Sequence, residues 1–460
     1  METSEHYTAV IWQCQLRHVK TLIERLAWPS TLQKAYHEVV TGANPKSFGP
    51  DRISIEDFRQ SYRSQIAALR NDIKSGNYHP SLGRGVPILK KRDGGLNRDN
   101  VRPITVFNIR DRIVQRAIAN LIWPALRTKV FSEVSFGGIR SYKTRGDRNK
   151  SCADVVKNVE SAARRILRLR SQGLVYTFET DIQRFFPSID RGRLLQSLRE
   201  VLPDDSLLEL IDKSINTEVA NASDIEARGL SECWDAELGV PQGAVLSPLL
   251  ANLYLAEFDE AINASGFSLV RYVDDLVIPT SSKAEAERAF HECKETLAKL
   301  GLSIHELNQK NEKGKIKTRV LGEYQSFEFL GLRFNKNSIH PAPNKLSDLK
   351  EKIRAATNAR IPHTTLVDVV NRLNRLLRGW MRAYRFCDFP PTMQKEIDHL
   401  AGSGLAAWME YHKLIPNAKR IDHNCRSLIG LWPSQSAEFR PISKAARLDA
   451  SAKELDADRR

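Results

Sequence analysis

The amino-acid sequence predicts an α+β fold in which a sheet carries helices on one face. Between residues 174 and 300, short β-type segments meet helical segments in an irregular order. Such an order favours an α+β sheet over a doubly wound one. From about residue 344 the pattern becomes purely helical and basic, which predicts a separate helical region.

The first 170 residues are predicted to be helical, with one β-hairpin between the helices. The ranges with helical spacing of apolar residues are 7–45, 54–76, 107–128 and 152–170. Ser54 is the candidate N-cap of the second range. Residues 83–106 alternate in strand fashion around Asp93-Gly94-Gly95, which is typical of a hairpin with a long loop.

The middle of the chain is predicted to alternate between strands and helices. Strands are expected at 174–180 and, as a pair around one tight turn, at 268–278; helices are expected at 191–217, 249–262 and 284–300. Pro341-Ala342-Pro343 marks the boundary to the helical C-terminal region. The last twenty residues are polar and are expected to fray.

The charge of the chain favours a polyanionic partner. The 460 residues carry a formal net charge of +15, and Lys and Arg recur from Arg17 to Arg460. A basic surface spread over a whole protein suits nucleic acid better than one small substrate. The alternative is that many proteins of ordinary function are simply basic.

The cysteines and the apolar stretches indicate a cytoplasmic protein without a membrane segment. No two of the six cysteines form a CxxC pair, which argues against a zinc site or a disulfide framework. The N-terminal sequence METSEHYTAV lacks the basic-then-apolar order of a signal peptide. No stretch approaches 18 uninterrupted apolar residues, so no transmembrane helix is expected.

Two adjacent acids, Asp274 and Asp275, interrupt an apolar strand pair. Carboxylates in such a place are costly unless they lie at a turn or meet a cation. A plain exposed turn is the alternative. A further acid, Asp181, ends the strand at 174–180, so the three side chains build an oxygen-rich cup of the kind that Mg²⁺ prefers. By alternation Glu179 shares a face with Asp181; it is expected to be solvent-exposed, and the alternative is an acid that lies behind the metal ligands and supports them.

Four segments, in this order, resemble the motifs of reverse transcriptases. They are Asp181 with its surroundings (motif A), the PQG and SP elements within residues 239–252 (motif B), the YVDD box at 272–275 (motif C) and the FLG turn at 329–331 (motif E). Segments at 47–53, 76–80, 110–115 and 374–384 are similar to the group II intron-like bacterial branch of that family.

The resemblance implies a right-hand polymerase with an extra helical C-terminus. It divides the chain into N-terminal helices and fingers (1–170), a palm with an antiparallel sheet (171–340), a helical thumb (341–435) and a polar tail (436–460). The implied activity is RNA-directed DNA polymerisation with two Mg²⁺ ions, for which Mn²⁺ is an alternative.

The resemblance also assigns roles around the three acids. Asp181, Asp274 and Asp275 are expected to hold the metal ions, together with the backbone of Ile182. Phe186 stands at the family's steric-gate position, where a large ring excludes the ribose 2′-OH of an rNTP. The alternative for this residue is a place in the core, beside its neighbour.

Further expected contacts reach the nucleotide. Lys91 and Arg102 are the implied clamps of the triphosphate, with Lys90 as a competitor for the first place and a solvated hairpin as the alternative. Gln242 and Gly243 are implied to touch the nascent base pair and the template.

A lysine of motif D is expected to protonate the leaving pyrophosphate, and arginines of the thumb are expected to bind the template–primer duplex. Lys317 lies twelve residues before Phe329, as in the motif, and Lys310 is its rival. The stripe of basic residues expected along the thumb helix is Arg375, Arg378, Arg382 and Arg385. A solvated charged face is the alternative for that stripe.

Several biological settings stay open at this stage. Compact size, the group II-like core and a private helical C-terminus favour a defence-associated enzyme that makes cDNA during phage infection. A group II intron-encoded reverse transcriptase and maturase is the runner-up, and an RNA-binding scaffold is a third candidate. Expected partners are an RNA template, which could be a dedicated non-coding RNA, a DNA or RNA primer or a protein hydroxyl, dNTPs, and a second copy or another protein.

Overall fold

The computed structural model describes residues 21–90, 95–97, 100–130, 134–138, 151–234, 238–310, 314–336, 338–362, 364–415 and 430–431, with the backbone alone at 128 and 151–158. The chain forms two compact units. The first comprises the described residues of Met1–Val155, Glu179–Ile278 and Glu287–Arg319; the second comprises those of Val156–Phe178, Pro279–Ala286 and Val320–Arg460. The four-part division predicted from the sequence stays a prediction.

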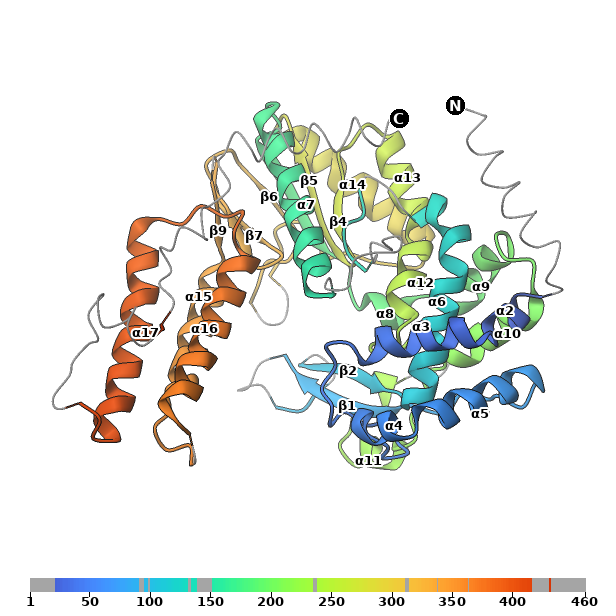
Figure 1. Cartoon of the computed structure of the whole chain (residues 1–460). Coiled ribbons are helices and arrows are strands. Elements are labelled where there is room, and N and C mark those ends of the chain that lie inside the picture. The colour runs from blue at the N-terminus through green and yellow to red at the C-terminus, as the bar shows by residue number, and fades with distance from the viewer. Residues whose placement is uncertain are drawn as a thin grey trace. The chain divides into compact units, whose positions relative to one another are not determined.

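The N-terminal part of the first unit is helical around one hairpin (Figure 1). Its helices are α2 (Leu22–Leu26), α3 (Pro29–Val40), α4 (Ile55–Gln60), α5 (Tyr62–Lys74) and α6 (Ile109–Val130). Strands β1 (Arg84–Leu89) and β2 (Val101–Val106) pair antiparallel, with Leu89 opposite Val101 at the loop end. The predicted hairpin is therefore confirmed.

The middle of the chain carries the elements that surround the acidic motifs. Helical elements are α8 (Phe185–Ser188), α9 (Arg191–Arg199), α10 (Asp205–Ser214), α11 (Ala222–Glu226), the 3-10 turn η1 (Ser231–Trp234), α12 (Ser247–Tyr254), α13 (Ala256–Ala264) and α14 (Lys283–Lys299). Strands β3 (Tyr176–Asp181), β4 (Val270–Tyr272), β5 (Asp275–Thr280) and β6 (Arg319–Leu321) form one sheet in the order β4-β5-β3-β6. The predicted strand pair at 268–278 is confirmed, because β4 and β5 pair antiparallel with Tyr272 opposite Asp275.

Four helices predicted as continuous are each broken into two. Within 7–45, whose residues before 21 lie outside the described part, Pro29 begins a second helix at its first turn. Within 191–217, α9 ends before Pro203, and the Asp204 side chain caps α10 by accepting from the Leu207 amide at 3.1 Å. The ranges 54–76 and 249–262 break at Ser61 and Leu255, each of which ends one helix and begins the next.

The second unit combines a small sheet with helices. From Val156 on it contains the rest of α7 (Ser151–Ser171). Strands β7 (Phe327–Phe329), β8 (Leu332–Phe334) and β9 (Ile339–Pro341) pair antiparallel, and the predicted FLG turn joins the first two. Helices α15 (Pro343–Ala356), α16 (Leu366–Ala383) and α17 (Pro391–Tyr411) pack alongside one another, which confirms the helical region expected from residue 344 (Figure 1). No described helix is long and apolar enough to cross a membrane.

Candidate catalytic site

The three predicted acids converge at one end of the four-stranded sheet. Asp181 ends β3, Asp275 begins β5, and these strands are neighbours in the sheet. The turn before β5 is tied to the residue after β3, because the Ile182 amide donates to the Asp274 carbonyl at 3.0 Å. The amide of Ile182 is thereby engaged, which leaves its carbonyl as the candidate metal ligand.

Lys317 lies directly against this cluster. Its Nζ is 2.5 Å from Asp181 Oδ2, and the neighbouring Thr318 hydroxyl lies 2.7 Å from the Thr180 hydroxyl. The rival Lys310 is exposed and forms an isolated antiparallel bridge with Ile316. Residues 311–313, between the two in the sequence, lie outside the described residues. Of the two lysines, Lys317 is therefore the one that contacts an acid of the cluster.

Glu179 is not solvent-exposed, contrary to the prediction. Only 17% of its side chain is accessible, and its Oε1 lies 2.9 Å from Arg319 Nη2. Arg319 begins β6, the strand that flanks β3, so the pairing across these strands covers the carboxylate. Glu179 is therefore covered because the neighbouring strand β6 supplies the guanidinium of Arg319.

The cluster holds more negative charge than its described surroundings neutralise. Burial, followed by the charges of Asp274 and Asp181, raises the pKa of Asp275 to about 7. Burial and the charge of Asp181 also raise the pKa of Asp274, although Lys317 and Arg102 oppose the rise. Carboxylates that share one site disfavour each other's charged form. Ionisation of the whole cluster therefore calls for an added cation.

The donor set fits a divalent cation. Asp181 Oδ1 is buried and has no hydrogen-bond partner among the described residues. Hard oxygen donors of this kind are the ligands of Mg²⁺ and Mn²⁺. In the described part of the chain no group of three His, Cys, Asp or Glu side chains is arranged to hold a metal ion as it stands. The ammonium of Lys317 is the cation that pairs with Asp181 in this arrangement.

Phe186 lies on the short helix α8 beside the cluster. Phe185 is buried, whereas Phe186 is only half-buried, and the two ring centroids are 5.4 Å apart. The Phe186 carbonyl accepts from the Val240 amide at 3.0 Å, which joins α8 to the start of the predicted motif B. Of the two rings, that of Phe186 is the more accessible.

The β1–β2 hairpin is joined to the predicted motif B turn. The Thr105 amide donates to the Gln242 carbonyl at 2.7 Å. Gly243 has a φ of 118°, and a Cβ built on it would lie 2.3 Å from the Thr105 carbonyl oxygen. Any larger residue at 243 would therefore separate the turn from β2. A cavity of about 240 Å³ beside this junction is lined by Gln242 and Trp234, among other residues.

The predicted triphosphate clamp is described only in part. Arg102 is exposed on β2, and its charge lies close enough to Asp274 to oppose the rise in the pKa of that carboxyl. Lys91 lies outside the described residues. Lys90, the competing lysine, is exposed at the end of β1.

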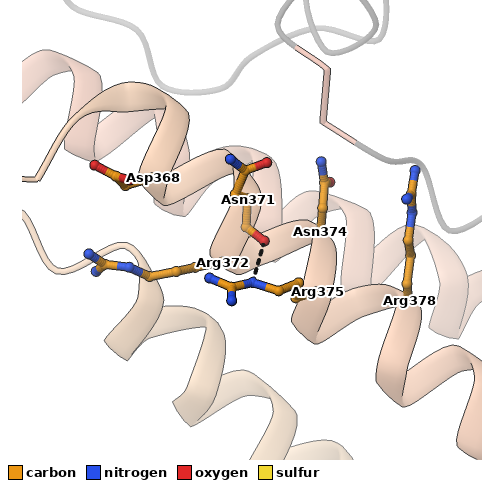
Figure 2. A pocket seen from close by; sticks show the side chains of 6 residues that line it. All are labelled: Asp368, Asn371, Arg372, Asn374, Arg375 and Arg378. Atoms are coloured by element: carbon orange, nitrogen blue, oxygen red, sulfur yellow. Dashed lines mark hydrogen bonds between the residues drawn. The ribbon is translucent and has the colours of Figure 1, made fainter. Parts of the chain in front are cut away.

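The predicted basic stripe divides into two parts, and Figure 2 shows the first part, Arg375 and Arg378, on α16. The apolar side of the helix is buried through Leu373, Leu377 and Met381. A hollow of about 410 Å³ on the other side is lined by Asp368, Asn371, Arg372, Asn374, Arg375 and Arg378. Arg382 is exposed. Arg385 follows the end of α16 at Ala383, contrary to the predicted stripe along one helix, and lies 3.4 Å from Glu160 Oε2; neither arginine lines the hollow. Arg372 was left out of the predicted stripe and the two asparagines were missed, although Arg372 lies three residues before Arg375 and each asparagine lies four residues before an arginine of the hollow.

Two family models match the chain. The model described as reverse transcriptase (RNA-dependent DNA polymerase) matches residues 88–334, which is more than half of the chain. The model described as the maturase-specific domain of group II introns matches residues 346–427. The helical C-terminal region is therefore shared with intron proteins, and the expectation that it is private to this chain is wrong.

Curated relatives are similar over about half of this chain. Protein YkfC of Escherichia coli K12 is 26% identical over 245 residues, which are 53% of this chain and 58% of that protein. The group II intron-encoded protein LtrA of Lactococcus lactis subsp. cremoris is 26% identical over 264 residues, which are 57% of this chain and 36% of that protein. Among solved structures, telomerase from Candida albicans in complex with a fragment of telomeric RNA gives a TM-score of 0.38 at 14% identity, with 87% of this chain and 69% of that chain covered.

Proposed function

Because the chain belongs to the reverse transcriptase (RNA-dependent DNA polymerase) family, we propose that it synthesises cDNA on an RNA template. Family membership also confirms the α+β right-hand polymerase fold that the sequence predicts. The observation that carries the proposed activity is the convergence of Asp181, Asp274 and Asp275 at one end of the sheet, with an excess of negative charge.

Divalent metal ions are general in this family, and the proposed ions here are two Mg²⁺, with Mn²⁺ as a substitute. The carboxylates of Asp181, Asp274 and Asp275 and the carbonyl of Ile182 would hold them. Two such ions supply charge stabilisation to the attacking and leaving oxygens of an in-line phosphoryl transfer. The buried Oδ1 of Asp181 supports this assignment, because a buried acceptor without a partner is costly.

Two cations are proposed to act on the triphosphate. Lys317 would transfer a proton to the leaving pyrophosphate, and its contact with Asp181 supports a place beside the reacting phosphates. Arg102, together with Lys91, would neutralise the charge that develops on the leaving group. The effect of Arg102 on Asp274 supports its proximity to the site.

Phe186 and the motif B turn are proposed to select the nucleotide and to hold the template. The half-buried ring of Phe186 would stand against the ribose 2′ position and exclude rNTPs. Gln242 would contact the incoming dNTP, and Gly243 would allow the backbone to approach the template. Their junction with β2 supports a turn of fixed position, because positioned groups contribute most to such a reaction.

The arginines of α16, and Arg385 just after this helix, are proposed to contact nucleic-acid phosphates. Arg375 and Arg378 line the hollow of Figure 2, and Arg382 is exposed beyond it. Arg385 is the weakest candidate, because Glu160 competes for its guanidinium. Phosphate contacts of this kind fix register without reading sequence.

The biological setting is a second proposal. The maturase-specific match at 346–427 supports an intron-type enzyme that also acts on intron RNA. An antiphage role, in which cDNA is made on a cellular or dedicated RNA, is the competing proposal. In either setting the primer is a nucleic-acid end or a protein hydroxyl.

Sequencing of the nucleic acid that co-purifies with wild-type protein and with the Asp274→Ala, Asp275→Ala variant tests these proposals. We expect a defined cDNA, joined to one bound RNA, with wild type only. Intron sequence in that RNA supports the intron setting, and another RNA supports the defence setting. Bound RNA in equal amount, without cDNA in either sample, would support an RNA-binding scaffold instead.

A further inference from the structure

A fully buried arginine lies three residues before Asp274. Arg271 is 0% exposed, on β4. Its Nε donates to Asp259 Oδ1 at 2.7 Å and its Nη2 donates to Asp259 Oδ2 at 2.5 Å, a bidentate pair between side chains that are 1% and 5% accessible. A charge buried this deeply is tolerated only when it is paired and hydrogen-bonded. The pair is therefore neutral and closed to solvent.

The third nitrogen of this guanidinium, Nη1, reaches the turn that carries the acids. Arg271 Nη1 donates to the Asn252 side-chain oxygen at 3.0 Å and to the Val273 carbonyl at 3.1 Å. Val273 has a φ of 61°, in the left-handed region, at the first position of a two-residue hairpin turn where glycine is usual. A β-branched residue is strained there, so the turn needs support from outside.

Both peptide groups that flank Asp274 are thereby held. The Val273 carbonyl is bound by Arg271, and the Asp274 carbonyl accepts from the Ile182 amide at 3.0 Å. The first bond comes from the buried pair and the second from the end of β3. The direction of the Asp274 side chain therefore depends on Arg271 as well as on the sheet.

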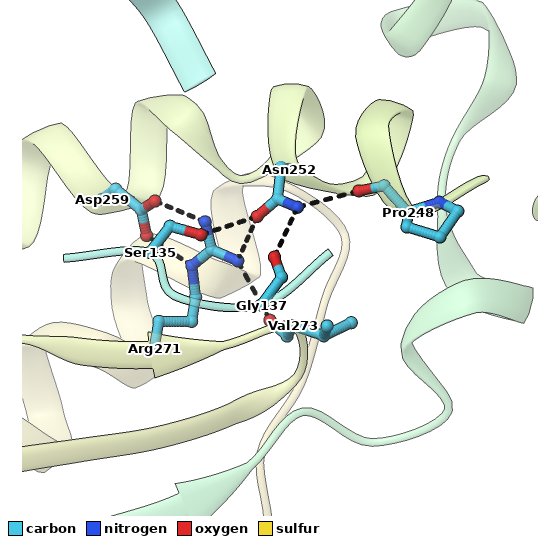
Figure 3. Close-up of polar contacts among 7 residues, drawn as sticks. All are labelled: Ser135, Gly137, Pro248, Asn252, Asp259, Arg271 and Val273. Carbon is cyan, nitrogen blue, oxygen red and sulfur yellow. Dashed lines mark hydrogen bonds and ion pairs between the residues drawn. The ribbon is translucent and has the colours of Figure 1, made fainter. Parts of the chain in front are cut away.

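Asn252 connects this pair to α12 and to the segment 134–138 (Figure 3). Its oxygen accepts from Arg271 and from the Ser135 hydroxyl at 2.8 Å, and its nitrogen donates to the carbonyls of Gly137 at 2.9 Å and Pro248 at 2.8 Å. All of its hydrogen-bonding capacity is used. A Cβ on Gly137 would lie 2.7 Å from the ring of Tyr272, so that segment also fits closely against the turn.

We propose that Arg271, Asp259 and Asn252 are positioning residues, which hold the strained Val273 turn so that Asp274 and Asp275 present their carboxylates to the metal ions. The network touches no reacting atom. It acts through the Val273 carbonyl and links the start of α12 to the turn. The proposal rests on the proposed metal site of Asp181, Asp274 and Asp275, and its kinetic readout rests in addition on the proposed polymerisation.

The test replaces the ion pair by apolar residues in the double variant Arg271→Met, Asp259→Leu. Such replacements commonly preserve a folded core, because they remove both buried charges together. We expect a melting temperature close to that of wild type. We also expect a loss of about 100-fold in the rate of dNTP addition and a rise of about tenfold in the Mn²⁺ dissociation constant, measured by electron paramagnetic resonance.

A second substitution separates positioning from core packing. Adding Val273→Gly to the double variant removes the strain of the left-handed residue, and we expect it to recover about tenfold in rate and most of the Mn²⁺ binding. The matched control replaces an exposed Arg–Asp pair of the same unit, Arg199→Met with Asp205→Leu, which leaves both readouts unchanged.

Two results would overturn the proposal. One is a folded double variant with wild-type Mn²⁺ binding and rate; the other is a loss that Val273→Gly does not recover. If the double variant does not fold, Arg271→Lys keeps the charge but not the planar fork, and the same criteria apply to it. Wild-type protein that binds Mn²⁺ without polymerising would refute the proposed function, whereas the binding readouts would still test the network.

Discussion

Two clusters of charged side chains lie three residues apart on one hairpin and differ in how their charges are balanced. Around Arg271, one guanidinium meets one carboxylate in a bidentate pair, and the polar neighbours are satisfied. Around Asp274, three carboxylates converge, and Lys317 pairs with one of them. The first cluster is balanced by its own residues, whereas the second is left with an excess of negative charge.

The comparison separates stability from function. A balanced buried cluster is costly to break from one side, because the remaining charge has no partner. A cluster of like charges is costly to leave as it is, and removal of one charge relieves it. The same substitution of Asp by Asn should therefore have opposite effects on stability in the two places.

The largest expected effect is on catalysis at the unbalanced cluster. Asp274→Ala with Asp275→Ala should lower the rate of dNTP addition by about 10³-fold or more, because two of the three carboxylates of the proposed metal site are lost. Single-turnover addition measures this, and Asp224→Ala, an exposed acid of the first turn of α11, is the control. A loss of less than tenfold would contradict the assignment of these two acids.

The largest expected effect on stability is at the balanced cluster. Asp259→Asn leaves the buried guanidinium of Arg271 without its counter-charge, and we expect the free energy of unfolding to fall by about 3–5 kcal/mol. Urea denaturation measures the change. The matched substitution Asp205→Asn in an exposed pair should change it by less than about 0.5 kcal/mol. Equal effects at the two sites would remove the distinction between the clusters.

In metal-free protein, Asp275→Asn is expected to raise the free energy of unfolding, whereas Asp259→Asn lowers it. The pKa of Asp275 is raised from 3.8 to about 7 in the folded state, so the folded state binds the proton more tightly than the unfolded chain does. Stability of the metal-free protein therefore falls as the pH rises from about 4 to about 7, and the charged carboxylate is destabilising above that range. We expect Asp275→Asn to raise the free energy of unfolding by about 2 kcal/mol at pH 8.

At pH 5 the difference from Asp275→Asn should be less than half of its value at pH 8, because only the lower part of the range from about 4 to about 7 has then been crossed. Denaturation at the two pH values in the presence of a chelator provides the measurement. A destabilised Asp275→Asn variant at pH 8 would show that the acids are already neutralised within the chain.

A smaller effect is expected from the lysine in the unbalanced cluster. Lys317→Ala should lower the rate of dNTP addition by about 10²-fold, as expected when one proton donor is removed. Lys310→Ala is the matched control, since Lys310 is the exposed lysine that competes with Lys317 for the motif D position. Equal losses for the two lysines, or a loss at 310 alone, would reverse the assignment.

The unbalanced cluster was predictable from the sequence, and the balanced one was not. The acids lie at the ends of short predicted strands, within motifs that follow one another in a known order, and this pattern predicts that they share one site. Arg271 carries no such signal, because it pairs with an acid twelve residues earlier on α13. A single arginine before an acidic turn reads equally well as a solvated side chain.

The helix boundaries show a related limit. The break at Pro29 has a local cause that the sequence contains, and the break before Asp204 has one in Pro203. Ser61 and Leu255 contain no such cause, because the apolar periodicity continues across both breaks. The burial of Glu179 could not be predicted either, because Arg319, which covers its carboxylate, lies 140 residues away in the sequence.

The most direct test of the central claim is extension of a labelled primer on a heteropolymeric RNA template by the purified full chain with Mg²⁺. Four dNTPs and four rNTPs are offered in separate and competing reactions. We predict Mg²⁺-dependent extension with dNTPs, strongly preferred over rNTPs, and none with Asp274→Ala, Asp275→Ala. Extension that is unchanged in that variant, or that uses rNTPs in preference to dNTPs, would contradict an RNA-directed DNA polymerase built on these acids.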